Sequence, residues 1–168
     1  IVPFLGRRIV EIGCGIGTFT RRLLDTADWV MGIEPNAACR ADLLAQVGTH
    51  PRFRLEPTPI ETCDAEALRA HAFDTAVLIN VLEHIADDTE ALRHCARILQ
   101  PGGRVVLIVP AVPMAYGPID RAVGHFRRYS RTDLGERLRR AGFIPEYLRY
   151  SNLVGLLGWM YNSKGKGI

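Results

Sequence analysis

Lysine is almost missing from this chain of 168 residues, since it occurs only at positions 164 and 166. A phosphate-binding loop of the Walker type ends in Gly-Lys followed by Ser or Thr, so no such loop lies ahead of position 164. The four cysteines, at positions 14, 39, 63 and 95, form no Cys-x-x-Cys pair and lack the spacing of a secreted scaffold. We therefore expect a reduced, cytoplasmic protein without a metal site.

Long hydrophobic runs are absent as well. No stretch reaches the roughly 18 apolar residues that a membrane span needs, and the amino terminus lacks the basic and apolar regions of a signal peptide. The tail at 151–168 contains an apolar run at 152–162, but two glycines interrupt it. This tail either packs on the domain or forms a pocket wall, a dimer contact or a membrane-surface contact.

A large excess of charge of either sign is also missing. The net charge of +3 is too small to predict a nucleic-acid partner by itself. The arginines are nevertheless concentrated, with eight of them against four acids between residues 120 and 149. The length and the 48% hydrophobic content are enough for one domain with a core of its own, so we expect a single domain over 1–168.

Short apolar, β-branched runs alternate with amphipathic stretches along the chain. The expected strands are 8–13, 29–34, 53–57, 74–80, 104–110 and 145–150. Several are apolar on both faces, which predicts an α/β fold with a doubly wound, mostly parallel sheet and helices on both faces. Such a sheet often has one more strand, so the chain is either a fragment or leaves that strand out of its ordered part.

Leucines at helical spacing fill the intervals between these strands. Asn36, Asp64 and one of Asp87 and Asp88 stand where they would cap helices. The segment Ser-Arg-Thr-Asp at 130–133 predicts a further helix start, and we expect that helix to end at Gly142. The sequence Gln-Pro-Gly-Gly at 100–103 predicts a tight turn into the fifth strand.

Three glycines at alternate positions, in Glu-Ile-Gly-Cys-Gly-Ile-Gly at 11–17, separate the first strand from the first helix. The helix N-terminus offers free N–H groups to an anionic ligand, and the absent side chains let the backbone approach it. A dinucleotide site needs Gly-x-Gly-x-x-Gly, but the third glycine is replaced by Thr18 counting from Gly13, and by Thr20 counting from Gly15. This spacing disfavours a nicotinamide cofactor.

The pattern Glu-x-Gly-x-Gly-x-Gly after a strand resembles the first motif of the class I S-adenosylmethionine-dependent methyltransferases. Three further segments resemble that family in the same order, namely 29–34, 73–85 and 99–110. The resemblance spans residues 8–110. It implies a Rossmann-like methyltransferase domain with S-adenosylmethionine as its cofactor.

The resemblance also assigns cofactor contacts residue by residue. Glu34 stands where the family has an acid that accepts hydrogen bonds from both ribose hydroxyls. Glu56 is the acid nearest the third strand, but Pro57 has no N–H for the adenine edge, so Thr58 or Ile60 is expected to supply it. The expected cofactor residues are Glu11, Gly13, Cys14, Gly15, Gly17, Glu34, Pro35, Glu56, Asn80, Val81 and His84.

The sequence Asn-Val-Leu-Glu-His at 80–84 leaves the fourth strand at the edge where the cofactor loop lies. Two interpretations stay open here. In relatives the first residues and the histidine line the methionine side of the cofactor, whereas Glu83 and His84 can also form a structural pair that closes the loop. Only two metal ligands are obvious at this point, so no metal is expected.

The segment 116–134 resembles a Gly-His-x-Arg-Arg-Tyr sequence in one branch of these methyltransferases. It follows the fifth strand, and long connections in compact domains are often functional, so we expect a substrate-side lid over 111–130. His125 is the candidate general base because histidine accepts protons near neutral pH. Asp120 is the candidate carboxylate that orients it.

Other residues of this segment have two interpretations each. Arg127 and Arg128 either grip a carboxylate or phosphate of the substrate, or hold the lid in place, with Arg127 paired to acids such as Asp120. Tyr116 and Tyr129 either stack on the substrate or face the sulfonium, or they pack in the core.

These patterns predict methyl transfer from S-adenosylmethionine to an oxygen or nitrogen of a small-molecule, lipid-linked or sugar-linked acceptor. The alternatives are a non-catalytic scaffold with the same fold and an RNA or protein methyltransferase that uses the arginine-rich face. No Asn-Pro-Pro-Tyr motif follows the fourth strand, as it does in amino-directed nucleic-acid methylases. We therefore expect no nucleic-acid partner and no membrane span, with a dimer through the apolar tail as one option.

Overall fold

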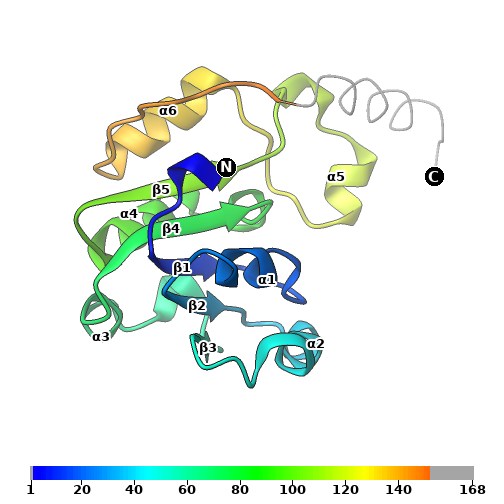
Figure 1. Ribbon diagram of the computed structural model, residues 1–168. Helices are drawn as coiled ribbons and strands as arrows, with labels where there is room; N and C mark the ends of the chain where they lie inside the picture. Colours follow the sequence, from blue (N-terminus) through cyan, green and yellow to red (C-terminus); the bar gives the residue numbers. More distant parts are fainter. Residues whose placement is uncertain (1, 152–168) are drawn as a thin grey trace.

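The computed structural model describes residues 2–151 and contains one five-stranded parallel sheet within them (Figure 1). The strand order is β3-β2-β1-β4-β5. The order of the strands therefore reverses between β1 and β4. Ligands bind at such a point of reversal in open α/β sheets. The strands are β1 (Arg8–Ile12), β2 (Trp29–Ile33), β3 (Phe53–Glu56), β4 (Phe73–Ile79) and β5 (Leu99–Ile108).

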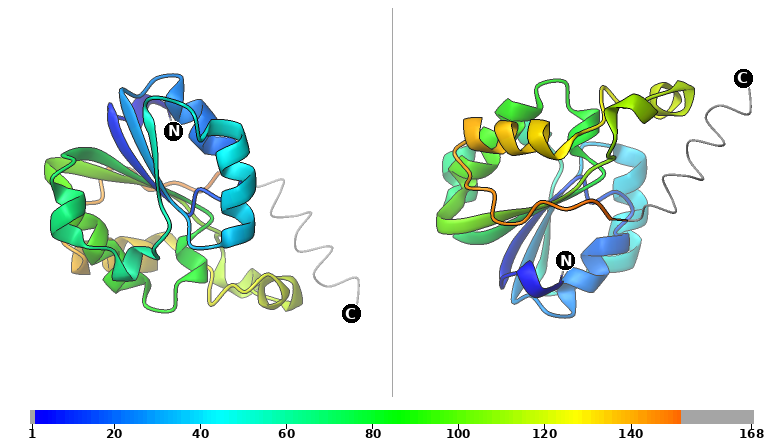
Figure 2. Two further views of the ribbon diagram at one scale, coloured as in Figure 1. Left: turned by 90° about the horizontal axis from the view of Figure 1, so that it is seen from below. Right: turned by 90° about the horizontal axis from the view of Figure 1, so that it is seen from above.

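Helices cover both faces of the sheet, as the sequence predicts (Figure 2). Side chains of α1 and α2 form one core cluster, whereas α3, α4 and α6 contribute to the other. α5 lies beyond the end of the sheet to which the strands point (Figure 1). The helices are α1 (Thr18–Leu24), α2 (Ala37–Val47), α3 (Ala65–Arg69), α4 (Asp88–Ile98), α5 (Pro118–Ala122) and α6 (Arg131–Arg140).

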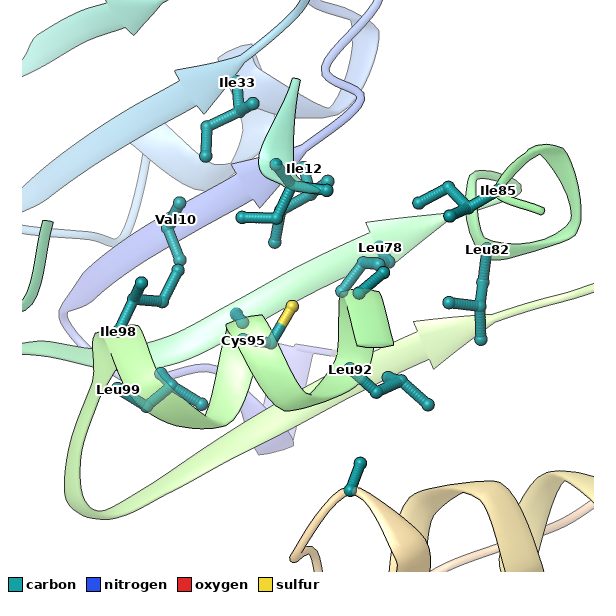
Figure 3. Close-up of a cluster of buried hydrophobic side chains, with 14 of the residues drawn as sticks. Val10, Ile12, Ile33, Leu78, Leu82, Ile85, Leu92, Cys95, Ile98 and Leu99 are labelled. Carbon is teal, nitrogen blue, oxygen red and sulfur yellow. The ribbon is translucent and has the colours of Figure 1, made fainter. Parts of the chain in front are cut away.

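The two core clusters lie on opposite faces because successive strand residues point to opposite sides. In β1, Ile9 belongs to the cluster under α1 and α2, and Val10 belongs to the other. Figure 3 shows Cys95 and Ile98 of α4 beside the strands that carry Val10 and Leu78. Both faces are thus apolar, which explains the near-continuous hydrophobic runs of these strands.

Four helices begin next to residues that the sequence predicts as N-terminal caps. Asn36 accepts a hydrogen bond from the N–H of Ala38, and Asp64 caps α3 in the same way. Asp87, rather than its neighbour, caps α4, and Ser130 caps α6. Each cap satisfies a backbone donor that the first helical turn leaves free.

The predicted strand at 145–150 is wrong for the part of the chain that the structure describes. No pairing joins this segment to the sheet. Its apolar side chains pack instead, since Leu148 joins the core cluster that includes α6, and the ring of Tyr147 stacks on Phe4 at 5.3 Å between centroids. The apolar residues of this segment therefore serve side-chain packing rather than strand pairing.

The fifth strand also differs from its expected bounds. β5 begins at Leu99, which pairs with Phe73, and the register shifts before Arg104 pairs with Thr75. The predicted tight turn at 100–103 is thus an irregularity within the strand, where Gly102 has a φ of 79°. A glycine adopts this left-handed conformation without steric cost.

Among residues 2–151, no helix has the length and hydropathy that crossing a membrane requires. The interpretations given to the apolar tail, including the dimer contact, fall on residues 152–168 and so lie outside the described part.

Candidate functional site

The glycine loop connects β1 to α1 at the carboxyl edge of the sheet, and its three glycines serve different purposes. A side chain at Gly13 would place its Cβ 2.5 Å from Val81 Cγ2, and one at Gly17 would place it 2.8 Å from Leu43 Cδ1. A Cβ at Gly15 would meet nothing within 4 Å. The backbone is therefore bare toward open space only at Gly15, while the other two glycines make room for neighbouring side chains.

Glu34 follows β2 directly and binds the open part of this loop. Its Oε2 accepts a hydrogen bond from the N–H of Gly15 at 2.8 Å, and its Oε1 accepts one from Asn36 at 2.8 Å. The residue is 7% exposed. A carboxylate offers about four lone-pair positions, so two remain for donors of a ligand at the place where Gly15 faces open space.

Glu11 and Cys14 support the loop from within the protein. Glu11 is 3% exposed, and its carboxyl accepts a 2.6 Å hydrogen bond from Thr20 Oγ1 in α1. Burial raises the pKa of Glu11 to about 7. The Cys14 sulfur lies against Gly32 of β2, and burial raises the pKa of this thiol. Neither side chain reaches solvent.

Some of the polar groups in the segment after β3 are already hydrogen-bonded to one another. Glu56 Oε1 accepts from the N–H of Thr58 at 2.9 Å. Of the two residues expected to meet an adenine edge, Thr58 therefore uses its N–H within the protein, and Ile60 is 2% exposed. Pro35, on the neighbouring strand end, is exposed.

The loop after β4 touches the glycine loop. Asn80 adopts a left-handed backbone with a φ of 53° and donates its N–H to Ile108 of β5 at 2.8 Å. This conformation is uncommon outside glycine, although Asn tolerates it better than most residues. Val81, which follows, fills the space left by Gly13. The predicted neighbourhood of the two loops is thus present.

Glu83, His84 and His125 come together next to this loop. Glu83 is completely buried, and neither of its carboxyl oxygens has a hydrogen-bond partner within residues 2–151. Its Oε1 lies 3.9 Å from His125 Nε2, and the rings of His84 and His125 meet edge to face at 4.7 Å. Burial raises the pKa of the Glu83 carboxyl and lowers that of the His84 imidazole.

Asp120 and His125, predicted as orienting carboxylate and base, are in direct contact. His125 Nδ1 lies 2.8 Å from Asp120 Oδ1, and Asp120 also accepts from Arg128 Nε and from the N–H of Gly117. Burial opposes ionisation of Asp120, but the hydrogen bonds from Arg128 and His125 hold its pKa below the ordinary value. Tyr116 donates its hydroxyl to the His125 carbonyl at 2.8 Å.

Arg127 pairs with an acid, as one of its two interpretations predicts, but the acid is Asp88 and not Asp120. Arg128, not Arg127, binds Asp120, and it is 7% exposed. Arg127 instead forms an ion pair with Asp88 at 2.6 Å and donates to the carbonyl of Ala86. Adjacent residues of an extended segment point in opposite directions, so the two arginines reach acids on different sides. Both hold the segment in place.

Asp88 is a residue that the sequence patterns do not single out as a centre of contacts. It accepts hydrogen bonds from Arg137 of α6 and from the Tyr129 hydroxyl, in addition to its ion pair with Arg127. Tyr129 is 1% exposed, which places it in the core. These three partners lie some forty residues or more away along the chain, and no local spacing connects them to Asp88.

The described geometry matches that of known proteins. Residues 2–147 match a family model described as a methyltransferase domain. The crystal structure of an S-adenosylmethionine-dependent methyltransferase from Mesorhizobium loti superposes with a TM-score of 0.71 at 21% sequence identity, covering 86% of this chain and 77% of that one. At this identity the likeness concerns the fold.

Sequence relatives include two proteins named ubiquinone biosynthesis O-methyltransferase. The chain is 37% identical to the one from Caulobacter sp. strain K31 over 108 residues, which cover 62% of this chain and 41% of that protein. It is 27% identical to the one from Ralstonia nicotianae over 172 residues, which cover 91% of this chain and 71% of that protein. The matched region is therefore only part of each relative.

Proposed function

The chain belongs to the class I S-adenosylmethionine-dependent methyltransferases, and on this premise we propose that it methylates a hydroxyl oxygen of a small-molecule, lipid-linked or sugar-linked acceptor. The contact between Asp120 and His125 carries the proposal, because a hydroxyl must lose its proton on methylation whereas an unprotonated amine need not do so beforehand. The names of the sequence relatives, which are O-methyltransferases, agree with this choice.

The residues around Gly15 fit the cofactor. Glu34 keeps two lone-pair positions for the ribose hydroxyls, and the backbone at Gly15 is open to a ligand. The N-terminus of α1 directs its positive end toward the same loop, which suits the carboxylate of an amino acid. When bound there, S-adenosylmethionine supplies an electrophilic methyl carbon on a positively charged sulfur.

His125 is the group that takes the acceptor proton. Ionised Asp120 is a pure acceptor, so the proton of the neutral imidazole lies on Nδ1 and the lone pair on Nε2. Nε2 would take the hydroxyl proton as the acceptor oxygen receives the methyl group, and the electron pair of the methyl–sulfur bond would stay on the sulfur of S-adenosylmethionine. The protein's main task is to hold the oxygen in line with the methyl group.

The substitution His125→Ala tests this role. We expect kcat to fall by about a hundredfold or more, as is usual on losing a general base, while the dissociation constant of S-adenosylmethionine stays the same. Formation of S-adenosylhomocysteine with a panel of hydroxylated and amine acceptors gives the rates, and calorimetry gives the affinity. A variant that turns over at the original rate, or an enzyme that methylates amines alone, contradicts the proposal.

The arginine-rich face gives less support to an RNA acceptor. Arg127, Arg128 and Arg137 form ion pairs with Asp88 or Asp120 inside the protein. Fewer of the eight arginines between 120 and 149 are thus available for phosphates than the sequence alone suggests.

A further inference from the structure

The carboxyl group of Glu83 is buried without a hydrogen-bond partner among the described residues. Its side chain is 1% exposed and neither oxygen accepts a hydrogen bond from residues 2–151. The nearest titratable nitrogen, His125 Nε2, is 3.9 Å from Oε1, which is too long for a hydrogen bond. Burying a carboxyl in this way costs free energy unless a further partner binds it.

Two imidazoles converge on the same point. One donor atom each from Glu83, His84 and His125 lies within 4.8 Å of the others. Ligand atoms of a tetrahedral zinc ion are separated by about 3.4 Å, because each bond measures about 2.0–2.2 Å. The three ligand atoms therefore need to close by up to about 1.4 Å, and rotation of the exposed side chain of His84 can provide part of this movement.

Asp120 adds the arrangement that normally supports a metal-binding histidine. It contacts His125 Nδ1 at 2.8 Å, which leaves Nε2 unprotonated and directed at Glu83. Metal-bound histidines almost always donate their other nitrogen to a carboxylate or carbonyl in this manner. Arg128 and Gly117 fix Asp120 in turn.

We propose that Glu83, His84 and His125 bind a divalent transition-metal cation. Two imidazoles and one carboxylate form a set typical of zinc, manganese, cobalt and iron(II) rather than of magnesium or calcium, which prefer oxygen ligands. Three protein ligands leave a coordination position open. This is the pattern of catalytic rather than structural metal sites.

The open position deepens the proposed function, on which this part of the inference rests. A hydroxyl bound to the cation loses its proton to water more easily than a free one, because the charge stabilises the alkoxide. Nε2 of His125 is then a ligand, and the imidazole acts as the base only in the metal-free enzyme.

Cobalt(II) is the probe for the binding test, since its visible spectrum reports ligand number and type. The full chain is treated with a chelator, dialysed and titrated with cobalt chloride. We expect one equivalent to bind with a tetrahedral or five-coordinate spectrum and without a thiolate charge-transfer band. Such a band would assign the metal to one of the cysteines and overturn the proposal, as would the absence of binding at millimolar cobalt.

Two variants and two controls locate the site. Glu83→Gln and His84→Ala should each weaken cobalt binding by at least about tenfold, as loss of a ligand does. Glu61→Gln and His50→Ala remove the same residue types elsewhere and should bind as the original chain does. His84 is exposed, so its variant remains informative if Glu83→Gln does not fold. Unchanged affinity in both site variants overturns the proposal.

Failure of the metal site and failure of the proposed function give different results. If cobalt does not bind but His125→Ala still loses activity, the methyltransferase proposal stands and the metal proposal falls. If cobalt binds to the predicted ligands but no hydroxylated acceptor is methylated, the metal proposal stands and the methyltransferase proposal falls.

Discussion

Glu11 shows how one buried carboxyl connects the stability of the fold with pH. It lies on the central strand, and its hydrogen bond from Thr20 attaches α1 to the sheet below the glycine loop. Burial raises its pKa from 4.5 to about 7. In the folded protein this carboxyl therefore stays protonated at pH values where the unfolded chain has already ionised it.

The variant Glu11→Gln tests this difference. Between pH 4.5 and 7 the folded protein holds a proton that the unfolded chain has released. The contribution of Glu11 to the free energy of unfolding is therefore complete below pH 4.5 and declines as the pH rises toward 7, by at most about 1.4 kcal/mol per unit. Glutamine cannot ionise, so the variant lacks this decline.

Urea unfolding at several pH values in this window measures the effect. The free energy of the original chain minus that of Glu11→Gln should fall as the pH rises, whereas the same difference for the exposed Glu61→Gln should stay flat. Parallel curves for the original chain and Glu11→Gln would refute the buried, protonated state of Glu11.

At the residue scale the sequence predicts contacts between motifs better than the state of each side chain. The contact between Asp120 and His125 follows from the motif, and the structure confirms it. The motif does not predict that Glu83 is buried without a hydrogen-bond partner, because the available partners come from other elements of the fold. The loop sequence pairs Glu83 with His84 alone, whereas the structure adds His125 from a segment forty residues further on.

In the glycine loop, the strain of a positive φ can be distinguished from the space that a residue leaves for a ligand. Gly15 and Gly17 both have positive φ, but only a side chain at Gly17 would meet a neighbour, namely Leu43. Gly102, in the irregular part of β5, also has positive φ and open space around it. It is a natural control for strain far from the cofactor.

We predict that Gly15→Ala weakens binding of S-adenosylmethionine by at least about tenfold, equivalent to about 1.4 kcal/mol, because the new methyl group occupies the space that the ligand needs. The left-handed backbone should cost about 1–2 kcal/mol of stability. Gly102→Ala should show a similar stability cost and unchanged affinity. Gly17→Ala should destabilise more than either, because its Cβ also contacts Leu43.

Calorimetry and chemical unfolding of the three variants measure these effects. Equal affinity in Gly15→Ala and Gly102→Ala would exclude Gly15 from the ligand site.

Elements are predicted where the information is local. Caps at Asn36, Asp64 and Ser130 and the apolar strands appear as expected, since each depends on neighbours in sequence. The segment 145–150 has the same apolar character but packs on α6 and on Phe4 without pairing. Strand formation needs a partner, and the sequence of one segment does not identify one.

On the scale of the whole molecule, Asp88 joins three parts of the fold. It lies in the first turn of α4, pairs with Arg127 of the segment 125–129 and with Arg137 of α6, and accepts a hydrogen bond from the Tyr129 hydroxyl. Burial opposes its ionisation, but the hydrogen bonds from Arg127 and Tyr129 hold its pKa below the ordinary value. Phe126 adds a backbone hydrogen bond to the carbonyl of Glu83 at 2.8 Å.

The variant Asp88→Asn should lower the free energy of unfolding by about 2 kcal/mol or more, because two partly buried arginines lose their counter-charge. Hydrogen exchange should quicken at residues 125–129 and in the first turn of α6. The neighbouring Asp87→Asn is the control, since asparagine caps a helix about as well as aspartate. Similar exchange in both variants would show that Asp88 does not anchor residues 125–129.

The anchoring of residues 125–129 has a consequence for how enzymes with this architecture diversify. His125, the proposed base, precedes Phe126, whose N–H binds the carbonyl of Glu83 in the loop after β4, and Val81 of the same loop lies against Gly13. The glycine loop and residues 125–126 thus share one point of contact, the loop after β4. The exposed residues 121–124 lie outside it, so mutations there are free to alter substrate preference over evolutionary time while the alignment needed for methyl transfer is inherited intact.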